Sequence, residues 1–262
     1  MKNIIESFVS IQGEGLRTGF PSLFVRLYGC NLRCVFHDVT GKFASACDTN
    51  YASFGTTPIG DTKTDEFVCE MLRNNPGVSD VVITGGEPLL NQPALVEFIK
   101  KLRDVRESED IHVTIETNGS IEPTDELLKE VDLWSVSPKL NSSVPTPEDA
   151  KTFNIPLAQC KLHDEKRINV DALSKIVSEG WDCQLKFVYS GPDCIEEIET
   201  LRDAIQQHTC ERVNDFIMLM PEGITEEAIL GKSDEVVKVC IEKGWTFSSR
   251  MHILIWGNVK EK

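Results

Sequence analysis

Short apolar runs alternate along the chain with segments in which apolar residues recur three and four positions apart. The runs are typical of strands buried on both faces, and the spacing is typical of amphipathic helices. The predicted strands are Leu23–Tyr28, Asp80–Thr84, His112–Glu116, Leu133–Val136, Cys183–Val188 and Phe216–Met220, with a further strand expected at Met251–Trp256. The predicted helices are Asp65–Arg73, Gln92–Val105, Asp171–Glu179, Cys194–Gln207 and Glu226–Lys243, with N-terminal caps at Thr64 and Asp125.

This alternation predicts an α/β fold built on parallel strands. About six strand–helix units are too few for a closed eight-fold barrel, so we expect a partial, open β/α barrel of about six parallel strands. We expect one domain over residues 1–262. Glycine and polar residues follow the predicted strands, as in Gly29-Cys30 and Gly85-Gly86-Glu87-Pro88. Because chemistry in such folds collects at the carboxyl ends of the strands, one site assembled from several strands is predicted.

Charge and hydropathy narrow the possible partners. The chain has 42 Asp and Glu against 27 Lys and Arg, a formal net charge of −15. That excess repels phosphate backbones, so we expect no direct nucleic-acid partner. No apolar run is long enough to span a membrane, and no basic stretch leads into a long apolar segment near the start. We therefore expect a cytoplasmic protein without a membrane partner.

Three of the nine cysteines carry the candidate chemistry. An odd number without an export signal argues against a disulfide framework. Cys30 and Cys34 directly follow a predicted strand, and Cys47 comes after the stretch 35–46. Three thiolates on a [4Fe–4S] cluster leave one iron open, as S-adenosylmethionine (SAM) requires. We interpret residues 30–60 as an enlarged cluster-binding loop with Cys47 as third ligand.

Other interpretations of these residues stay open. His37 stands where radical SAM enzymes usually have their third cysteine, and an imidazole can ligate a cluster. Cys30, Cys34, His37 and Cys47 can also supply four zinc ligands. Buried, inert thiols are common, and we expect that role for Cys69, Cys183, Cys194, Cys210 and Cys240.

Several motifs, in order and spanning nearly the whole chain, resemble one family. They include Ser10–Gly15, Phe24–Leu27, Gly29–Leu32, Cys47–Thr49, Thr84–Pro88, Glu116–Gly119, Ser137–Lys139, Gln184–Val188, Met220–Gly223 and His252–Asn258. Together they resemble the 7-carboxy-7-deazaguanine synthases, which are radical SAM enzymes.

The resemblance implies a reaction. SAM would be cleaved reductively to methionine and a 5′-deoxyadenosyl radical, which takes a hydrogen from 6-carboxy-5,6,7,8-tetrahydropterin. The pterin would then contract a ring and lose ammonia to give 7-carboxy-7-deazaguanine, on the route to queuosine-type products of tRNA modification. The resemblance further implies Mg²⁺ and a homodimer, and we expect an electron donor such as flavodoxin.

The resemblance also suggests roles for the residues at the strand ends. Gly85 and Gly86 would let the backbone approach SAM, and Glu87 would accept hydrogen bonds from its ammonium. Its ribose and carboxylate would be lined by Asn118, Ser137 and Lys139. The alternative interpretation is a set of ordinary strand-ending turns.

The predicted substrate residues surround the pterin. Gln12 and Glu14, followed by Gly15, suit its guanidine-like edge, and a bidentate Arg26 suits its carboxylate. Glu116 is expected to contact the pterin, and the Thr49 hydroxyl is expected to ligate Mg²⁺. The alternatives are a glycine turn at 12–15, a surface ion pair for Arg26 and a buried, paired carboxylate for Glu116.

Three residues and two rival functions complete the prediction. Lys186 either reaches the site or caps the barrel, whereas His252 and Trp256 are expected to pack in the core near the chain end. One rival is another radical SAM enzyme, such as one that activates glycyl-radical proteins. The other is a non-catalytic protein that binds a metal or cluster.

Overall fold

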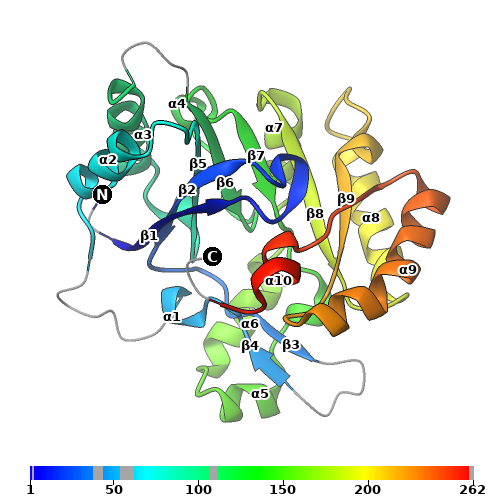
Figure 1. Cartoon of the computed structure of the whole chain (residues 1–262). Coiled ribbons are helices and arrows are strands. Elements are labelled where there is room, and N and C mark those ends of the chain that lie inside the picture. The colour runs from blue at the N-terminus through cyan, green and yellow to red at the C-terminus, as the bar shows by residue number, and fades with distance from the viewer. Residues whose placement is uncertain (2, 38–43, 54–61, 107–110, 260–262) are drawn as a thin grey trace.

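An eight-stranded sheet forms the centre of the molecule (Figure 1). The computed structural model describes residues 1, 3–37, 44–53, 62–106 and 111–259. In spatial order the strands are β1 (Ile4–Ile11), β2 (Pro21–Leu27), β5 (Asp80–Gly85), β6 (His112–Thr117), β7 (Leu133–Val136), β8 (Cys183–Tyr189), β9 (Ile217–Pro221) and β10 (Thr246–Phe247). Neighbours from β2 to β10 are parallel, and only β1 among these strands runs antiparallel to its partner. Within the described chain β1 and β10 are the edges, so the barrel is open.

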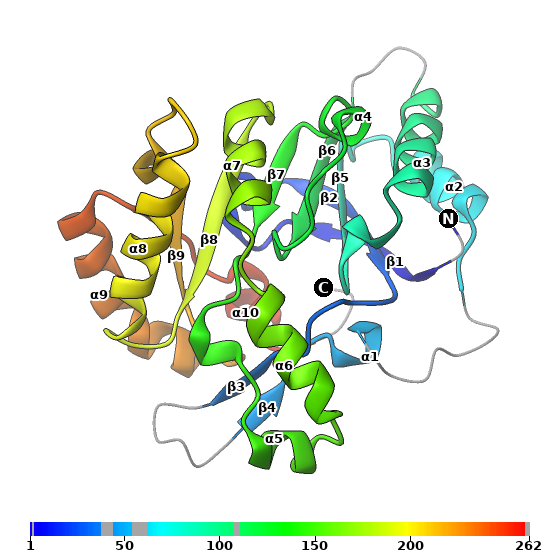
Figure 2. The same ribbon diagram turned by 180° about the vertical axis from the view of Figure 1, so that it is seen from behind.

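Helices cover one face of this sheet (Figure 2). Those on that face are α2 (Asp65–Asn74), α3 (Gln92–Asp104), α4 (Asp125–Leu128), α7 (Val170–Glu179) and α8 (Cys194–Gln206). The remaining helices are α1 (Asn50–Ser53), α5 (Pro147–Thr152), α6 (Leu157–Lys166), α9 (Glu226–Lys243) and α10 (Met251–Trp256). α9 packs beside β9 and β10, and four short 3₁₀ turns lie at 15–17, 88–91, 141–143 and 213–216.

The register of the parallel strands lines up apolar side chains across the sheet. Val25 pairs with Ile83, which pairs with Ile115, and all three are fully buried. Consecutive strand residues such as Val81, Val82 and Ile83 are buried, so side chains on both faces of the strand avoid solvent and the apolar runs in the sequence are continuous. The six predicted strands are confirmed, with ends shifted by about one or two residues.

β1 was not predicted, because its polar residues Glu6, Ser7 and Ser10 interrupt the apolar pattern of an edge strand. The predicted strand Met251–Trp256 is wrong, since this segment is the helix α10. A six-residue apolar run cannot be assigned by periodicity alone. The Asp125 cap is also wrong: Thr124 accepts the hydrogen bond from Leu127 N–H, whereas Thr64 is confirmed as a cap.

An accessory lobe lies outside the main sheet. It consists of the antiparallel hairpin β3 (Val35–His37) and β4 (Ala44–Ala46) together with α5 and α6. These elements lie together at the bottom of Figures 1 and 2. Two stretches of the expected cluster loop, 38–43 and 54–61, lie outside the described residues.

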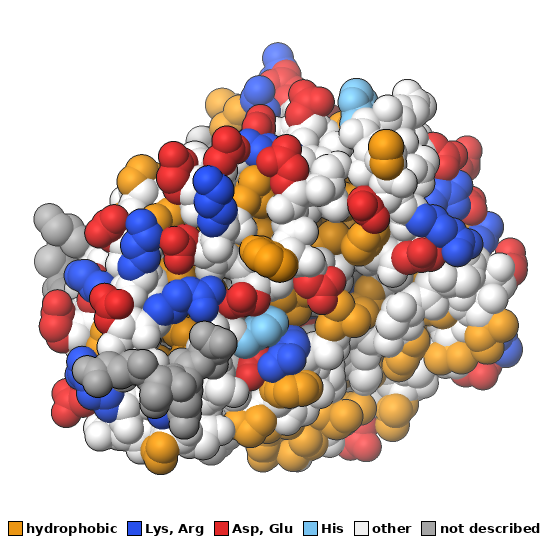
Figure 3. Space-filling view, turned by 90° about the horizontal axis from the view of Figure 1, so that it is seen from above, with side chains coloured by type: hydrophobic (Ala, Val, Ile, Leu, Met, Phe, Trp, Pro, Cys, Tyr) orange, Lys and Arg blue, Asp and Glu red, His pale blue; other side chains and the backbone are white. Residues whose placement is uncertain are grey.

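The surface seen from above carries acidic and basic side chains mixed with one another (Figure 3). Among the described residues, no helix is both long and apolar enough to cross a membrane. All nine cysteines are free, and Cys210 is exposed, which corrects its expected burial.

Candidate active site

Cys30 lies at the carboxyl end of β2, where two other segments hold its backbone. Gly29 turns the chain with φ of +104°. Its N–H donates to Ala52 O over 2.7 Å, and its carbonyl accepts from Glu87 N–H over 2.6 Å. Cys30 N–H donates to Ser53 O at 3.2 Å. The first predicted ligand is therefore fixed between α1 and the end of β5.

The two glycines after β5 are required by the neighbouring strand. A Cβ on Gly86 would lie 1.9 Å from Gly29 O, and one on Gly85 would lie 2.1 Å from Leu27 O. Gly85 also has φ of +135°, which favours glycine. The structure thus explains both glycines through β2, and their approach to SAM stays a prediction.

Cys34 and Cys47 are neighbours despite the twelve residues between them. In the hairpin Val35 pairs with Ala46, so the cysteines flank its open end. Cys47 N–H donates to Cys34 O at 3.1 Å. The enlarged loop therefore brings its two cysteines together.

The surroundings of the three thiols suit ligands of a metal cluster better than free, reactive thiols. Burial raises the pKa of all three, that of Cys30 to about 11. The Cys47 thiolate would raise the pKa of Cys30 and Cys34, the Cys30 thiolate would raise that of Cys34, and the Lys139 ammonium lowers the pKa of all three. Leu32 N–H also donates to the Cys30 sulfur at 3.4 Å. Buried thiols of this kind ionise when a metal sits among them, so this donor set fits a [4Fe–4S] cluster.

His37 points elsewhere in this structure. Its Nε2 lies 3.1 Å from the Asp149 carboxylate of α5. Among the residues described, no group of three or more His, Cys, Asp or Glu side chains is arranged to hold a metal ion. The contact with Asp149 directs His37 toward α5 and does not support it as a cluster ligand.

The residues predicted to bind SAM meet beside Cys30. Asn118 Nδ2 lies 3.9 Å from the Cys30 sulfur, and Lys139 Nζ donates to Ser137 Oγ at 3.0 Å. Glu87 is 2% exposed. Its carboxylate accepts bonds from Leu89 N–H, Thr117 Oγ1 and Asn118 N–H. Glu87 therefore joins the ends of β5 and β6, and its contact with the SAM ammonium stays a prediction.

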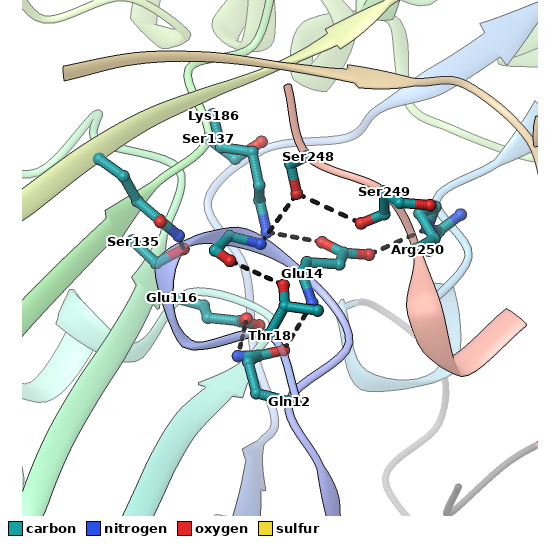
Figure 4. A network of polar contacts seen from close by, with 12 residues as sticks. Gln12, Glu14, Thr18, Glu116, Ser135, Ser137, Lys186, Ser248, Ser249 and Arg250 are labelled. Carbon is teal, nitrogen blue, oxygen red and sulfur yellow. Dashed lines mark hydrogen bonds and ion pairs between the residues drawn. The ribbon is translucent and has the colours of Figure 1, made fainter. Parts of the chain in front are cut away.

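A polar network forms the predicted substrate end of the site (Figure 4). Gln12 Nε2 donates to Glu116 at 3.2 Å, and Gln12 Oε1 accepts from Glu14 N–H at 3.2 Å. Gly15 N–H donates to Ser248 Oγ at 2.8 Å. Three of the predicted pterin residues, Gln12, Glu14 and Glu116, are thus brought together by the turn after β1.

Two cations hold Glu14. Lys186 Nζ lies 2.5 Å from one oxygen, and Arg250 Nε donates to the other at 2.9 Å. Burial by itself would raise the pKa of Glu14, but Lys186 and Arg250 outweigh it and lower that pKa well below its usual range. Glu14 is therefore an anion at neutral pH. Lys186 reaches the site, and it does not cap the barrel.

Arg250 also joins the two ends of the site. Its guanidinium donates to Gly223 O at 2.7 Å and to Asp48, between Cys47 and Thr49, at 3.2 Å. One side chain thus contacts both the pterin end and the third-cysteine segment. These contacts use all three nitrogens of the guanidinium, whereas the three donors of a lysine share a single nitrogen.

Arg26 and Thr49 are the last two predicted binding residues. Arg26 Nε donates to Glu6 at 2.6 Å, and Tyr51 of α1 donates to the same carboxylate. Arg26 thus forms an ion pair, but a largely buried one and not the surface pair considered above. Thr49 Oγ1 lies 3.3 Å from the Cys47 sulfur.

The two residues expected to pack near the chain end differ in their surroundings. His252 lies against Gly13, where an added Cβ would lie 2.0 Å from the His252 Nδ1. Trp256 is 38% exposed, so it is not a core residue.

Sequence reasoning missed Arg250 and Asp48, and also His163 of α6, whose Nδ1 accepts the N–H of Arg33 next to Cys34. Arg250 follows two serines and precedes an apolar run, which is no known signature. Asp48 stood inside a quoted motif but received no role. His163 lies in a segment whose apolar residues show no clear helical spacing. Its burial within α6 was therefore not predicted from the sequence. The only usable signal was the adjacency of Asp48 to Cys47.

The comparisons with known proteins agree with one another. The model of the 4Fe-4S single cluster domain family matches residues 11–154. A 7-carboxy-7-deazaguanine synthase from Halobacterium salinarum is 38% identical over 98% of this chain and 91% of its own length. One of the same name from Rhodopirellula baltica is 36% identical over 97% and 86%. The crystal structure of QueE from Escherichia coli has a similar fold, with a TM-score of 0.55 and 22% identity over 96% of this chain and 94% of that one.

Proposed function

The chain belongs to the 7-carboxy-7-deazaguanine synthase family, and we propose that it converts 6-carboxy-5,6,7,8-tetrahydropterin to 7-carboxy-7-deazaguanine with loss of ammonia. It is a radical SAM lyase of 7-deazapurine biosynthesis by this membership. The observation that most supports the reaction is that Cys30, Cys34 and Cys47 lie at the same rim of the sheet as a buried polar network.

We propose that Cys30, Cys34 and Cys47 hold the [4Fe–4S] cluster. When bound, the cluster and SAM together supply the radical chemistry that removes a hydrogen atom from the substrate. Lys139 stabilises the three thiolates electrostatically, since it lowers the pKa of each. Gly85, Gly86, Glu87, Asn118, Ser137 and Lys139 are the proposed SAM residues.

The polar network is the proposed pterin site. The anionic Glu14 and the carboxyl group of Glu116 suit the N–H groups of a guanidine-like edge, and the Gln12 amide suits an adjacent carbonyl. Because Lys186 and Arg250 already hold both oxygens of Glu14, this carboxylate stays in place before the substrate arrives. Preorganised groups of this kind lose little freedom when they bind a ligand. Gly15 shapes the turn, and Arg26 is proposed to bind the substrate carboxylate.

Further features of this function are proposals that rest on the family resemblance. They are a Mg²⁺ ion bound by Thr49, a homodimer, a flavodoxin-like electron donor, a cytoplasmic location and a product used in tRNA modification. For Mg²⁺, a single protein oxygen is enough because this ion keeps several waters.

The test is anaerobic turnover. The reconstituted enzyme is incubated with SAM, a strong reductant, Mg²⁺ and the carboxylated pterin, and products are identified by mass spectrometry. We expect 5′-deoxyadenosine and 7-carboxy-7-deazaguanine from the wild type and neither from Cys47→Ala. Formation of 5′-deoxyadenosine without the deazaguanine would instead indicate another radical SAM reaction.

A further inference from the structure

The accessory lobe has an apolar core of its own. Val35 of the hairpin is fully buried there, together with Ala150, Ile155 and Cys160, and Phe153 packs against them. This cluster is separate from the large core under the main sheet. The hairpin therefore has a partner of fixed shape in α5 and α6, and it is more than a surface loop.

The lobe holds the chain on both sides of Cys34. On one side, Arg33 N–H donates to Nδ1 of His163 in α6 at 3.0 Å. On the other side, Val35 is buried in the core of the lobe. A backbone fixed at the residues before and after a cysteine fixes its Cα and Cβ, so that its sulfur is limited to the staggered χ1 positions.

His163 is itself fixed in one orientation. It is fully buried. Because Nδ1 accepts the Arg33 N–H, Nε2 carries the proton and donates to Ser143 Oγ at 3.2 Å. Ser143 in turn donates to Leu140 O at 2.7 Å, beside Lys139. The imidazole thus links the cluster loop to the segment that follows β7.

Cys47 is held through the same lobe. The pairs Val35–Ala46 and His37–Ala44 place it opposite Cys34, and its N–H donates to Cys34 O at 3.1 Å. The contact of His37 with Asp149, at 3.1 Å, ties the hairpin to α5 as well. Insertion of a hairpin between two cysteines thereby sets the distance between their backbones.

We propose that the accessory lobe is a clamp that sets the positions of Cys34 and Cys47 for cluster binding, with His163 as its positioning residue. The clamp assigns a role to β3 and β4, which lie between these cysteines, and makes His37 an anchor of the hairpin. It rests on the proposed function only in requiring a cluster, and the pterin reaction is not part of it.

The test compares two replacements of His163 with a surface control. His163→Phe fills the space but removes both hydrogen bonds, whereas His163→Asn retains an acceptor near Nδ1. His208→Phe changes an exposed histidine after α8. Each protein is reconstituted anaerobically, and we measure iron and sulfide per chain, the rate of iron loss to a chelator and the electron paramagnetic resonance spectrum of the reduced cluster.

We expect His163→Phe to lose iron at least about tenfold faster than wild type, at temperatures well below its unfolding midpoint, with a changed spectrum. His163→Asn should restore much of the retention, and His208→Phe should match wild type. Wild-type iron loss in His163→Phe, or no rescue by asparagine, would overturn the proposal.

If His163→Phe does not fold, Val35→Ala tests the clamp through the apolar core of the accessory lobe. It removes only buried methyl groups, and we expect the same faster iron loss; an unchanged rate would overturn the proposal. A protein that binds the cluster normally but forms no deazaguanine would refute the proposed function alone.

Discussion

The two ends of the site are held by different forces. At the cluster end, the accessory lobe fixes the loop by apolar packing and by hydrogen bonds of a neutral imidazole, since burial lowers the pKa of His163 to about 4. At the pterin end, buried ions of opposite sign hold one another, with Glu14 between Lys186 and Arg250. The cluster end should therefore respond to changes in side-chain volume, and the pterin end to changes in charge.

Glu14→Gln should have the largest effect, because it leaves the buried Lys186 ammonium facing a neutral amide and removes one of the two carboxylates that Arg250 contacts. Breaking a buried ion pair costs about 3–5 kcal/mol of stability. Urea unfolding under anaerobic conditions measures this loss. Glu165→Gln, at an exposed pair on α6, should change stability by less than about 0.5 kcal/mol. Equal losses in the two variants would contradict the assignment of buried charge to Glu14.

The same variant predicts a dependence on pH. Because the folded-state pKa of Glu14 is lowered, its stabilisation is complete above the ordinary value of 4.5 and is lost as the pH falls below it. The difference in the free energy of unfolding between wild type and Glu14→Gln should therefore shrink between pH 5 and pH 3. Its slope against pH should be roughly that expected for the uptake of one proton. A difference that stays constant on acidification would contradict this prediction.

Gly86→Ala tests the close approach of Gly86, which follows β5, to Gly29, which follows β2. The added Cβ would lie 1.9 Å from Gly29 O, so the backbone must shift. We expect a loss of about 1–3 kcal/mol in the free energy of unfolding. Gly231→Ala in α9, where a Cβ meets nothing within 4 Å, should instead stabilise by about 0.5–1 kcal/mol. A similar sign in both variants would contradict the close approach.

Arg250→Lys keeps the charge but not the fork. We expect a roughly tenfold rise in the KM for the pterin, equivalent to one lost charge-assisted hydrogen bond of about 1.5 kcal/mol. Iron content should not change. Arg202→Lys, in a surface cluster on α8, serves as the control and should leave KM unchanged. Reduced iron content with a normal KM would contradict the role of Arg250 at the pterin end.

Ile155→Val is the smallest change and acts on the other end. Loss of one buried methylene from the lobe costs about 1 kcal/mol. It should quicken iron loss to a chelator slightly while the KM for the pterin stays at the wild-type value. Together with Arg250→Lys it separates the two ends, and a shift in KM without faster iron loss would contradict that separation.

The features predicted from the sequence are mainly local ones. The parallel strands could be predicted because their apolar runs are continuous. Cys30 and Cys34 could be identified because they follow such a run directly. Arg250 was not, because it meets Glu14 from 236 positions away through the fold. His163 likewise contacts Arg33 across 130 positions. Met251–Trp256 was misassigned since a short apolar run fits a strand and a helix equally well.

For some residues the predicted position was right, but the physical reason given for the residue type was incomplete. Gly85 and Gly86 were assigned to a close approach of the backbone to SAM, yet the neighbouring strand already excludes side chains there. Glu87 was assigned to a ligand, yet it first joins β5 to β6. Sequence motifs identify such positions without saying which of their neighbours requires them.

The central claim is that Cys30, Cys34 and Cys47 hold a [4Fe–4S] cluster. Its most direct test is the iron and sulfide content of wild type, Cys47→Ala and His37→Ala after anaerobic reconstitution. We predict about four irons and four sulfides per chain in wild type and in His37→Ala, and a marked loss in Cys47→Ala. Full content in Cys47→Ala together with loss in His37→Ala would contradict it.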